Sequence, residues 1–487
     1  MNKAPELASS AAPSLIPGRS AGWRAALARS IYCVCGWLLT PIIILYLLWR
    51  ARRQPEYLQH WAERWGMAIP RQDTFPLIWL HAVSVGETRA AQPLLQRLFE
   101  SYPTHRFLLT HMTPTGRATS HKLFAAFLAQ TLTDDQGQTV PRLTISYLPY
   151  DFLFAVRRFF KTWRPDVLLL METELWPNLI HTAAARGCKT ALINARLSEK
   201  SLRKLRRFHS LAQAGIGKLD VLAAQTYPDA ARLQSIVPRD IAVTGNLKFD
   251  IWPTRQQQEA GQQLRQQIAP LTQGSEKPRS VLLLASTREG EEALLLTAYA
   301  EYIHQGWLVI VVPRHPQRFE AVAQWLKMHG LVYQRRSEGQ VIGPDCQVLL
   351  GDTMGEMFAY YEACDVAFIG GSLLPLGGQN LIEACAVGRP VLVGPHTFNF
   401  AEATAQAIEA GAALRVPDAE AVFLKMQHLE MDPALRETMS KAALAFSQRH
   451  RGATQRTLDV LTPLLAQAAQ PQTLAAPSPV DSEAPGL

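Results

Sequence analysis

Carboxylates at strand-to-helix junctions are the first chemical feature of this sequence. In "HAVSVGETRA", residues 81–90, Glu87 follows an apolar run and lies three positions after Ser84, where a segment with helical spacing begins. This is the spacing of a helix capping box, in which the carboxylate only binds a free backbone N–H. A carboxylate at the end of a strand can also act as a general base when burial raises its pKa. The two roles compete, because accepting a backbone N–H lowers that pKa. We expect Gly86, which has the backbone freedom of glycine, to turn the side chain away from the cap and toward a cleft.

The same three-residue spacing recurs at other strand-to-helix junctions. Taken alone, each pair is explained by helix capping, but its position at a strand end favours a functional role. In open α/β sheets ligands bind beyond the carboxyl ends of the strands. The three further pairs are Ser286 and Glu289, Thr353 and Glu356, and Asn380 and Glu383.

The second half of the chain has features of a nucleotide site. In "GGSLLPLGGQNLIEACAVGRPVLVG", glycines precede a helix expected near Asn380, and Glu383 lies in its first turn, where a carboxylate can accept both hydroxyls of a ribose. Arg314 and His315 end a strongly apolar run, and a guanidinium there suits a phosphate. Gly355 in "GDTMGEM" offers open backbone amides. Neither a Walker lysine motif nor G-x-G-x-x-G accompanies them.

Short apolar runs alternate with helical patterns along most of the chain, which predicts parallel sheets wound with helices. The length of 487 residues requires more than one domain. We predict two doubly wound α/β domains that face one cleft. The predicted divisions are an N-terminal segment, 1–53; a first domain, 54–250; a connector, 251–278; a second domain, 279–467; and a disordered tail, 468–487, rich in Ala, Pro and Ser.

Residues 31–49 carry no charge, and 19 helical residues reach about 28 Å, near the thickness of a bilayer core. Arg50, Arg52 and Arg53 follow, and such residues prefer the cytoplasmic side. We expect a retained membrane anchor with the bulk of the protein in the cytosol. An interfacial helix and a cleaved signal remain alternatives, and Pro41 leaves true spanning open.

The net charge of +8 suggests an acidic partner. The stretch "SEKSLRKLRRFHS" is strongly basic, which fits either a solvated helix face or contact with a phosphorylated lipid or anionic headgroups. No nucleic-acid motif accompanies it, so nucleic acid is not expected. The six cysteines form no C-x-x-C pair, and no clustered Cys/His pattern predicts a metal. The basic residues of that stretch are Lys200, Arg203, Lys204, Arg206 and Arg207.

The blocks "HAVSVGE", "HMTPTG", "METELWPN", "NARLS", "GNLKFD", "VPRHP", "GDTMGEM", "GGSLLPLGGQNLIEA" and "GPHTFNF" resemble, in this order, 3-deoxy-D-manno-octulosonic acid (Kdo) transferase. The resemblance runs from the anchor to about residue 450. It implies a metal-independent GT-B glycosyltransferase of lipopolysaccharide core biosynthesis, with an acceptor-binding N-terminal and a donor-binding C-terminal domain. The donor would be CMP-Kdo and the acceptor the lipid A precursor (lipid IVA). No cofactor is implied, and the location would be the cytoplasmic face of the inner membrane.

The resemblance also implies roles for individual residues. Glu87 would be the catalytic base, and Glu172 and Lys248 would stabilise the transition state. Lys248 and Arg314 would offset the charge that develops on the departing CMP phosphate. The implied CMP contacts are Arg314, His315, Met354, Gly355, Glu356, Asn380, Leu381, Ile382 and Glu383.

Two other functions stay open at this level. One is a related GT-B transferase or nucleotide-sugar epimerase with UDP or ADP donors, which protection from heat by CMP but not by UDP would oppose. The other is a catalytically silent, membrane-bound nucleotide sensor or scaffold. The crowding of a candidate base, two cations and a second carboxylate opposes a silent protein.

Overall fold

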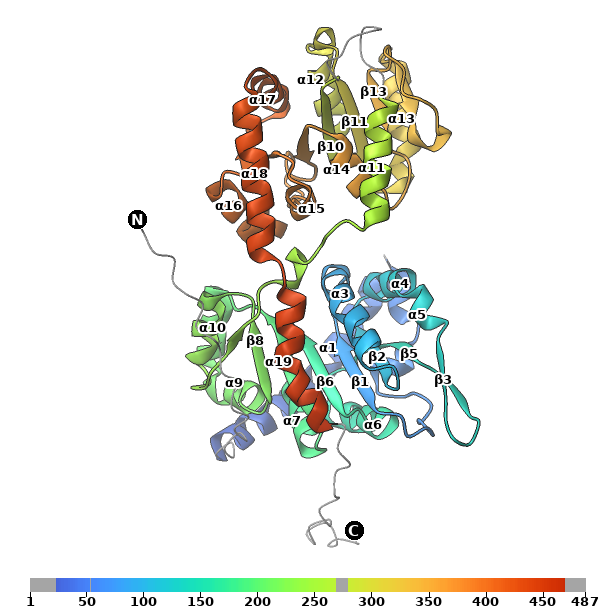
Figure 1. Ribbon diagram of the computed structural model, residues 1–487. Helices are drawn as coiled ribbons and strands as arrows, with labels where there is room; N and C mark the ends of the chain where they lie inside the picture. Colours follow the sequence, from blue (N-terminus) through green and yellow to red (C-terminus); the bar gives the residue numbers. More distant parts are fainter. Residues whose placement is uncertain (1–22, 53, 269–278, 469–487) are drawn as a thin grey trace, which may run out of the picture. The chain divides into compact units, whose positions relative to one another are not determined.

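The computed structural model describes residues 23–52, 54–268 and 279–468, which form two compact units (Figure 1). The first unit comprises the chain up to Asp250 together with the segment from Gly452, and the second is Ile251–Arg451. Each unit is built on a seven-stranded parallel sheet. The prediction of two doubly wound, Rossmann-like α/β domains is thereby confirmed.

The sheet of the first unit has the order β5-β2-β1-β6-β7-β8-β9. Its central strands are apolar runs with every residue buried, as expected for strands covered by helices on both faces. A separate antiparallel hairpin joins β3 and β4. The strands are β1 (Leu77–His81), β2 (Arg106–His111), β3 (Thr131–Thr133), β4 (Thr139–Pro141), β5 (Leu143–Tyr147), β6 (Val167–Met171), β7 (Lys189–Ala195), β8 (Val221–Ala224) and β9 (Ala242–Val243).

Alternate residues of β1 build the two cores of this unit, because successive side chains on a strand point to opposite faces. Trp79 packs on Phe159, with ring centroids 4.7 Å apart, whereas Leu80 lies in the other core with Leu94. The helices are α1 (Trp23–Ala51), α2 (Trp61–Arg64), α3 (Val85–Ser101), α4 (Pro114–Leu123), α5 (Ala125–Leu128), α6 (Leu153–Trp163), α7 (Pro177–Ala185), α8 (Glu199–Arg207), α9 (His209–Ile216), α10 (Tyr227–Gln234) and α19 (Ala453–Ala468).

The second unit repeats the plan with the strand order β12-β13-β11-β10-β14-β15-β16. Its strands are β10 (Val281–Thr287), β11 (Leu308–Pro313), β12 (Tyr333–Arg335), β13 (Val348–Leu350), β14 (Val366–Ile369), β15 (Val391–Val393) and β16 (Ala413–Arg415). Its helices are α11 (Arg255–Gln267), α12 (Glu291–Ala300), α13 (Phe319–Met328), α14 (Met357–Ala363), α15 (Ile382–Ala386), α16 (Ala401–Glu409), α17 (Ala419–Met431) and α18 (Pro433–His450).

The unit boundaries differ from the predicted ones at the C-terminal end. Helix α19 was expected in the second domain, but its Leu461 and Leu464 are buried in a core of the first unit, along whose sheet the helix runs in Figure 1. The carboxylate of Asp250 accepts the backbone N–H groups of Gly452, at 2.6 Å, and Thr454, and so caps α19. The chain therefore returns to the first unit for its last described helix, because α19 buries apolar side chains there.

The predicted connector is also structured over much of its length. Helix α11 packs on α14 through Gly261, where an added Cβ would lie 2.3 Å from the Cβ of Glu362. Arg265 forms an ion pair with Asp365 at 3.2 Å. This segment therefore belongs to the second unit, while 269–278 and the predicted tail beyond Ala468 lie outside the described residues.

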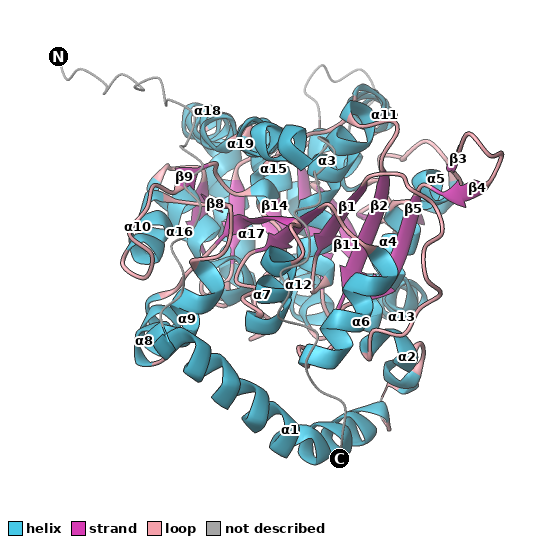
Figure 2. Ribbon diagram, turned by 90° about the horizontal axis from the view of Figure 1, so that it is seen from below, coloured by secondary structure: helices cyan, strands magenta, loops and turns pink. Residues whose placement is uncertain are grey.

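Helix α1 contains the predicted anchor, and it is the helix of the described chain that is long and apolar enough to cross a membrane. The helix contacts the rest of the first unit. The ring of Trp37 stacks on that of Phe154, with ring centroids 5.3 Å apart, and the Cys33 thiol donates to Asn178 at 3.3 Å. Figure 2 shows its beginning near α8 and α9. Large apolar residues are exposed along its length. They are Trp23, Leu27, Ile31, Val34, Trp37, Leu38, Leu39, Ile42, Leu45, Tyr46, Leu48 and Trp49.

Candidate active site

Glu87 lies in the first turn of α3, directly after β1, and its carboxylate folds back on the start of the helix. One oxygen accepts the N–H of Val83 at 2.8 Å, and the other accepts the hydroxyl of Ser84 at 3.1 Å. The expectation that Gly86 turns this side chain away from the cap is wrong. Gly86 is a residue of α3, and the unpaired N–H groups at the helix start attract the carboxylate.

Burial nevertheless dominates the electrostatics of Glu87, which is only 8% exposed. Desolvation raises the pKa of Glu87 to about 7, against the lowering effect of the Val83 N–H. The negative charges of Glu172 and Glu174 raise this pKa further, while the Ser84 hydroxyl lowers it. A carboxyl with a pKa near neutrality is divided between its two forms at pH 7, which is the condition a general base needs.

Glu172 and Lys248, to which the resemblance assigns transition-state stabilisation, meet in the first unit. Glu172 follows β6 with a φ of +57°, a conformation that costs energy for a residue with a side chain. Its carboxylate lies 2.8 Å from the Nζ of Lys248, which stands in a short 3₁₀ turn, Leu247–Phe249. Buried Asn194 accepts the N–H of Leu247 at 3.0 Å and so holds this turn against β7. The strand ends thereby position the ion pair.

Glu174 is a member of this cluster that the sequence reasoning missed. Burial raises its pKa to about 7, with a further contribution from the charge of Glu172, although the indole N–H of Trp176 donates to it at 2.7 Å. Its carboxylate also lies 3.9 Å from the Nε2 of His81. Burial lowers the pKa of His81 to about 3, so this imidazole is neutral at pH 7 and the pair is not an ion pair. The sequence signal that could have identified Glu174 is the block "METELWPN", which contains both Glu172 and Glu174.

In the second unit, Arg314 and His315 follow β11 as predicted. His315 is exposed as a whole residue, but its ring is partly desolvated. This desolvation, together with the nearby charges of Arg288 and Arg314, lowers the pKa of His315. Arg288 follows the neighbouring strand β10. Two guanidinium groups near one imidazole make this sheet edge attractive to an anion.

The loop after β13 carries Met354, Gly355 and Glu356. Gly355 has a φ of +90° and open space where a Cβ would stand, so its backbone can be approached closely. Met354 is exposed. Glu356 is paired with the guanidinium of Arg336 at 3.1 Å, a partner that the sequence did not predict.

Asn380 and Glu383 form a contact of their own, since the Asn380 amide donates to the Glu383 carboxylate at 3.2 Å. Burial raises the pKa of Tyr361, and the charges of Glu383 in α15 and Arg314 after β11 both act on this hydroxyl. Leu381 and Ile382 are almost fully buried. Their side chains belong to the core, so only their backbone can reach a ligand.

The pair Ser286 and Glu289 does not form a cap, because α12 begins at Glu291 and Glu289 instead pairs with Arg318 at 3.3 Å. The carboxylate that organises this junction is Glu291, which the sequence reasoning missed. It is fully buried and accepts the N–H groups of Arg288, Gly371 and Leu373 at 3.0, 2.5 and 2.9 Å. Glu291 thus fixes the glycine loop after β14. Within the described ranges, no group of three His, Cys, Asp or Glu side chains could hold a metal ion.

Two parallel, doubly wound units with polar residues at the carboxyl ends of their strands define a GT-B type fold. The UDP-GlcNAc 2-epimerase from Neisseria meningitidis has this architecture at 15% identity, with a TM-score of 0.50 over 80% of this chain and 100% of that chain. At this identity the likeness concerns the fold alone.

The sequence comparisons are more specific. A family model of 3-deoxy-D-manno-octulosonic-acid transferase (kdotransferase) matches residues 59–251. The 3-deoxy-D-manno-octulosonic acid transferase of Bordetella pertussis is 45% identical over 444 residues, which cover 89% of this chain and 98% of that protein. The enzyme of the same name from Haemophilus influenzae is 34% identical over 87% of this chain and 96% of that protein. The chain belongs to the Kdo transferase family, and it is a Kdo glycosyltransferase.

Proposed function

We propose that this protein transfers Kdo from CMP-Kdo to a sugar hydroxyl of the lipid A precursor (lipid IVA), in lipopolysaccharide core biosynthesis. Membership of the Kdo transferase family identifies Kdo as the transferred sugar. The observation that carries the chemistry is buried Glu87, whose pKa is raised to about 7 beside the Glu172 and Lys248 pair. A glycosyl transfer to a hydroxyl needs a base of this kind, because the oxygen must lose its proton as the new bond forms.

In the proposed step, the acceptor oxygen bonds to the anomeric carbon of Kdo while its proton passes to Glu87. The bond from this carbon to the CMP phosphate breaks, and CMP leaves with the electron pair. Lys248, held at 2.8 Å by Glu172, offsets negative charge that develops in the transition state. The reaction needs no other proton acceptor from the protein.

The cap geometry of Glu87 is compatible with this role. Each carboxylate oxygen has two lone pairs, and in the described contacts one is used by Val83 and one by Ser84. A substrate hydroxyl can therefore bind the remaining positions while the cap holds the carboxylate in one orientation. We infer that Val83 and Ser84 position the base.

The second unit is the proposed site for the CMP part of the donor. Arg314 and His315 would meet the phosphate, and the Glu383 carboxylate would accept the ribose hydroxyls. The open backbone of Gly355 and the exposed side chain of Met354 would lie against the nucleotide. Glu356, Asn380 and the backbone of residues 381–382 complete the proposed set.

The proposed location is the cytoplasmic face of the inner membrane. Helix α1 supports it, because its apolar residues are exposed and basic Arg50 and Arg52 follow the apolar run. An acceptor that is itself a membrane lipid requires an enzyme at the membrane surface.

The test is to incubate the purified protein with CMP-Kdo and a tetraacylated, bisphosphorylated lipid A precursor, and to measure the lipid by mass spectrometry. We expect Kdo to be added, also in the presence of a chelator, and CMP but not UDP to protect the protein from heat. Glu87→Gln should transfer Kdo more slowly by about 10² or more at the same protein concentration. Transfer from a UDP sugar instead, or a fully active Glu87→Gln protein, would overturn the proposal.

A further inference from the structure

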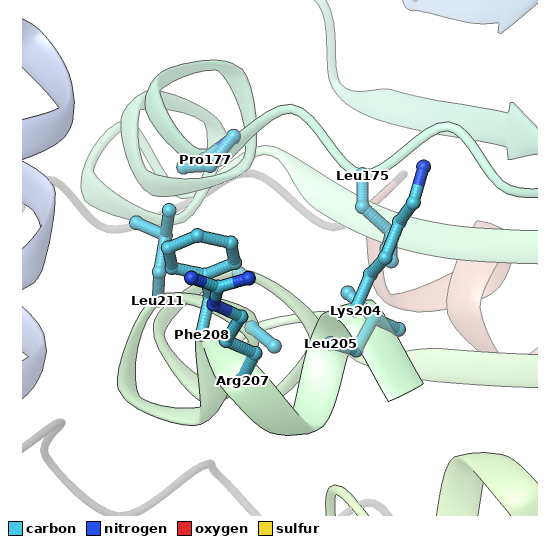
Figure 3. Close-up of a pocket in the computed structure, with 9 residues that line it drawn as sticks. Leu175, Pro177, Lys204, Leu205, Arg207, Phe208 and Leu211 are labelled. Carbon is cyan, nitrogen blue, oxygen red and sulfur yellow. The ribbon is translucent and has the colours of Figure 1, made fainter. Parts of the chain in front are cut away.

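The first unit contains an apolar pocket of about 510 Å³ that the catalytic scheme does not use (Figure 3). Its volume lies within the range of small-molecule sites, roughly 300–1,000 Å³. Helix α9 supplies Leu211, Ala212 and Gly215, and α8 supplies Leu205. A pocket with such a lining favours a hydrocarbon over a polar ligand.

Cations and an aromatic ring border this apolar pocket. Lys204 and Arg207 of α8 line it, and both are exposed. The Lys204 side chain extends beside Leu175, and the Arg207 guanidinium lies near Phe208, 6.0 Å from its ring centre (Figure 3). Phe208 is 61% exposed, although a large aromatic ring is usually covered. A pocket with an apolar lining and cations at its edge is suited to a ligand that has a hydrocarbon chain and an anionic group.

The pocket shares a loop with the proposed catalytic cluster. The segment between β6 and α7 places Glu172 and Glu174 in the cluster, and its next residues include Leu175 and Pro177, which line the pocket. A single short stretch of backbone thus carries both the carboxylates and one wall of the pocket. A ligand seated in the pocket is therefore held close to the residues that perform the transfer.

The membrane helix candidate lies next to the same elements. Helix α1 packs against α9, and its Cys33 donates to Asn178 at the start of α7. Helix α1 has exposed apolar residues and packs on α9, the helix that lines the pocket. The membrane helix candidate and the pocket are therefore joined through one shared element.

We propose that this pocket binds one acyl chain of the acceptor lipid, while Lys204 and Arg207 contact a phosphate of the same molecule. The inference rests on the proposed function and adds an acceptor site to it. The shared loop favours the acceptor over a bulk phospholipid, because only the acceptor must also present a hydroxyl to the carboxylate cluster. The pocket would set the register of the acceptor sugar relative to Glu87.

Steady-state transfer to two acceptors tests this directly. One acceptor is the tetraacylated, bisphosphorylated lipid A precursor in mixed micelles, and the other is its fully deacylated, water-soluble form. Leu211→Trp fills the pocket from a partly exposed position. We expect the KM for the acylated acceptor to rise about tenfold or more, from the lost burial of several methylene groups, with kcat little changed. The KM for the deacylated acceptor should not change.

Charge reversal on α8 supplies a matched pair of variants. Lys204→Glu with Arg207→Glu should raise the KM for both phosphorylated acceptors, whereas Lys200→Glu with Arg203→Glu changes the same charge on the same helix without touching a lining residue. We expect the second pair to have a much smaller effect. Equal effects of both pairs, or equal effects of Leu211→Trp on both acceptors, would overturn the proposal. If wild type used neither acceptor, the proposed function itself would fail.

A binding measurement keeps the pocket testable without transfer. Dodecyl phosphate should raise the Tm of the wild type, and dodecanol and inorganic phosphate should raise it less. Leu211→Trp should abolish the shift. Variants that bind anionic phospholipid vesicles less well, but keep the kinetics of wild type in micelles, would assign the pocket to the bilayer and overturn its assignment to the acceptor.

Discussion

The two units have the same architecture but use their strand ends for different chemistry. In the first unit the charge of Glu172 raises the pKa of both Glu87 and Glu174, and burial, the larger cause, takes each of these two to about 7. In the second unit, Glu291 satisfies three backbone N–H groups and Glu356 pairs with Arg336. One sheet edge therefore has carboxylates suited to proton transfer, and the other has carboxylates that shape loops. The fold is shared, and the local partners decide the function.

A second contrast concerns strained residues. Asn194 in β7 and Ser286 in β10 both have a positive φ, of 51° and 55°, and both lie at irregularities in the strand register. In the first unit the strained residue holds the turn that carries Lys248. In the second unit the carbonyl oxygen of Ser286 would lie 2.6 Å from a Cβ at Gly370, so the bulge allows the glycine loop to approach. Such strain is maintained only where the surrounding packing compensates it.

The largest expected effect separates the two roles of Glu87. Glu87→Gln keeps a carbonyl oxygen that can accept the Val83 N–H but cannot take a proton, so we expect transfer to fall by about 10² or more while the Tm is retained. Glu87→Ala should lose both the rate and about 1 kcal/mol of stability from the cap. Turnover assays and thermal unfolding measure the two quantities. A Glu87→Gln protein with near-normal turnover would mean that the carboxylate is only a cap.

Lys248→Met should lower kcat by about 10² or more, because it removes a fixed charge that acts on the transition state. The matched control is Lys441→Met, which removes the lysine of an exposed ion pair with Glu437 at 2.6 Å in the second unit. An exposed pair of this kind contributes little. Similar kinetics for both variants would show that the first unit's ion pair is only structural.

Variants of the second unit should change donor binding more than turnover. For Arg314→Met we expect the KM for CMP-Kdo to rise about tenfold to a hundredfold, the range for a lost hydrogen bond to a charged group. Heat protection by CMP should decrease in parallel. If kcat fell instead with an unchanged KM, the division of roles between the two units would be wrong.

The pH dependence sharpens the comparison further. A base with a pKa of about 7 predicts that kcat falls up to about tenfold per pH unit below 7. The folded pKa of Glu87 exceeds its ordinary value of 4.5, so the native state binds more protons between these values, and its stability decreases as pH rises through this window. Glu87→Gln should therefore have a higher Tm relative to wild type at pH 8 than at pH 5. A flat difference would contradict the raised pKa.

The smallest expected effect concerns the unit boundary. Asp250→Ala removes the acceptor for the Gly452 and Thr454 N–H groups at the start of α19, and it should cost the first unit about 1 kcal/mol. Hydrogen exchange should increase in α19 and in the core it covers. Equal protection in wild type and variant would show that the cap adds nothing to the packing of Leu461 and Leu464.

Much of the architecture could be predicted, because buried parallel strands are continuous apolar runs between helical patterns. The runs "VLLLM" and "LVIVVP" became β6 and β11, with Glu172 and Arg314 directly after them. The family resemblance assigned Glu172 and Lys248 a common role, but nothing in their spacing indicates that the two side chains form an ion pair. Helix α19 was assigned to the wrong unit, because an amphipathic pattern shows that a face is buried but not which core receives it.

The sequence by itself determined the alternation of strands and helices, the glycines where the backbone turns, and the carboxylates at strand ends, since these depend on local residue types and spacing. The tertiary structure decided which of those carboxylates lie together. Glu87, Glu172 and Glu174 share a cluster because the ends of the paired strands β1 and β6 lie together, and Glu289 is exposed because α12 begins two residues later. Burial and neighbouring charge set a pKa, and both depend on residues distant in the chain.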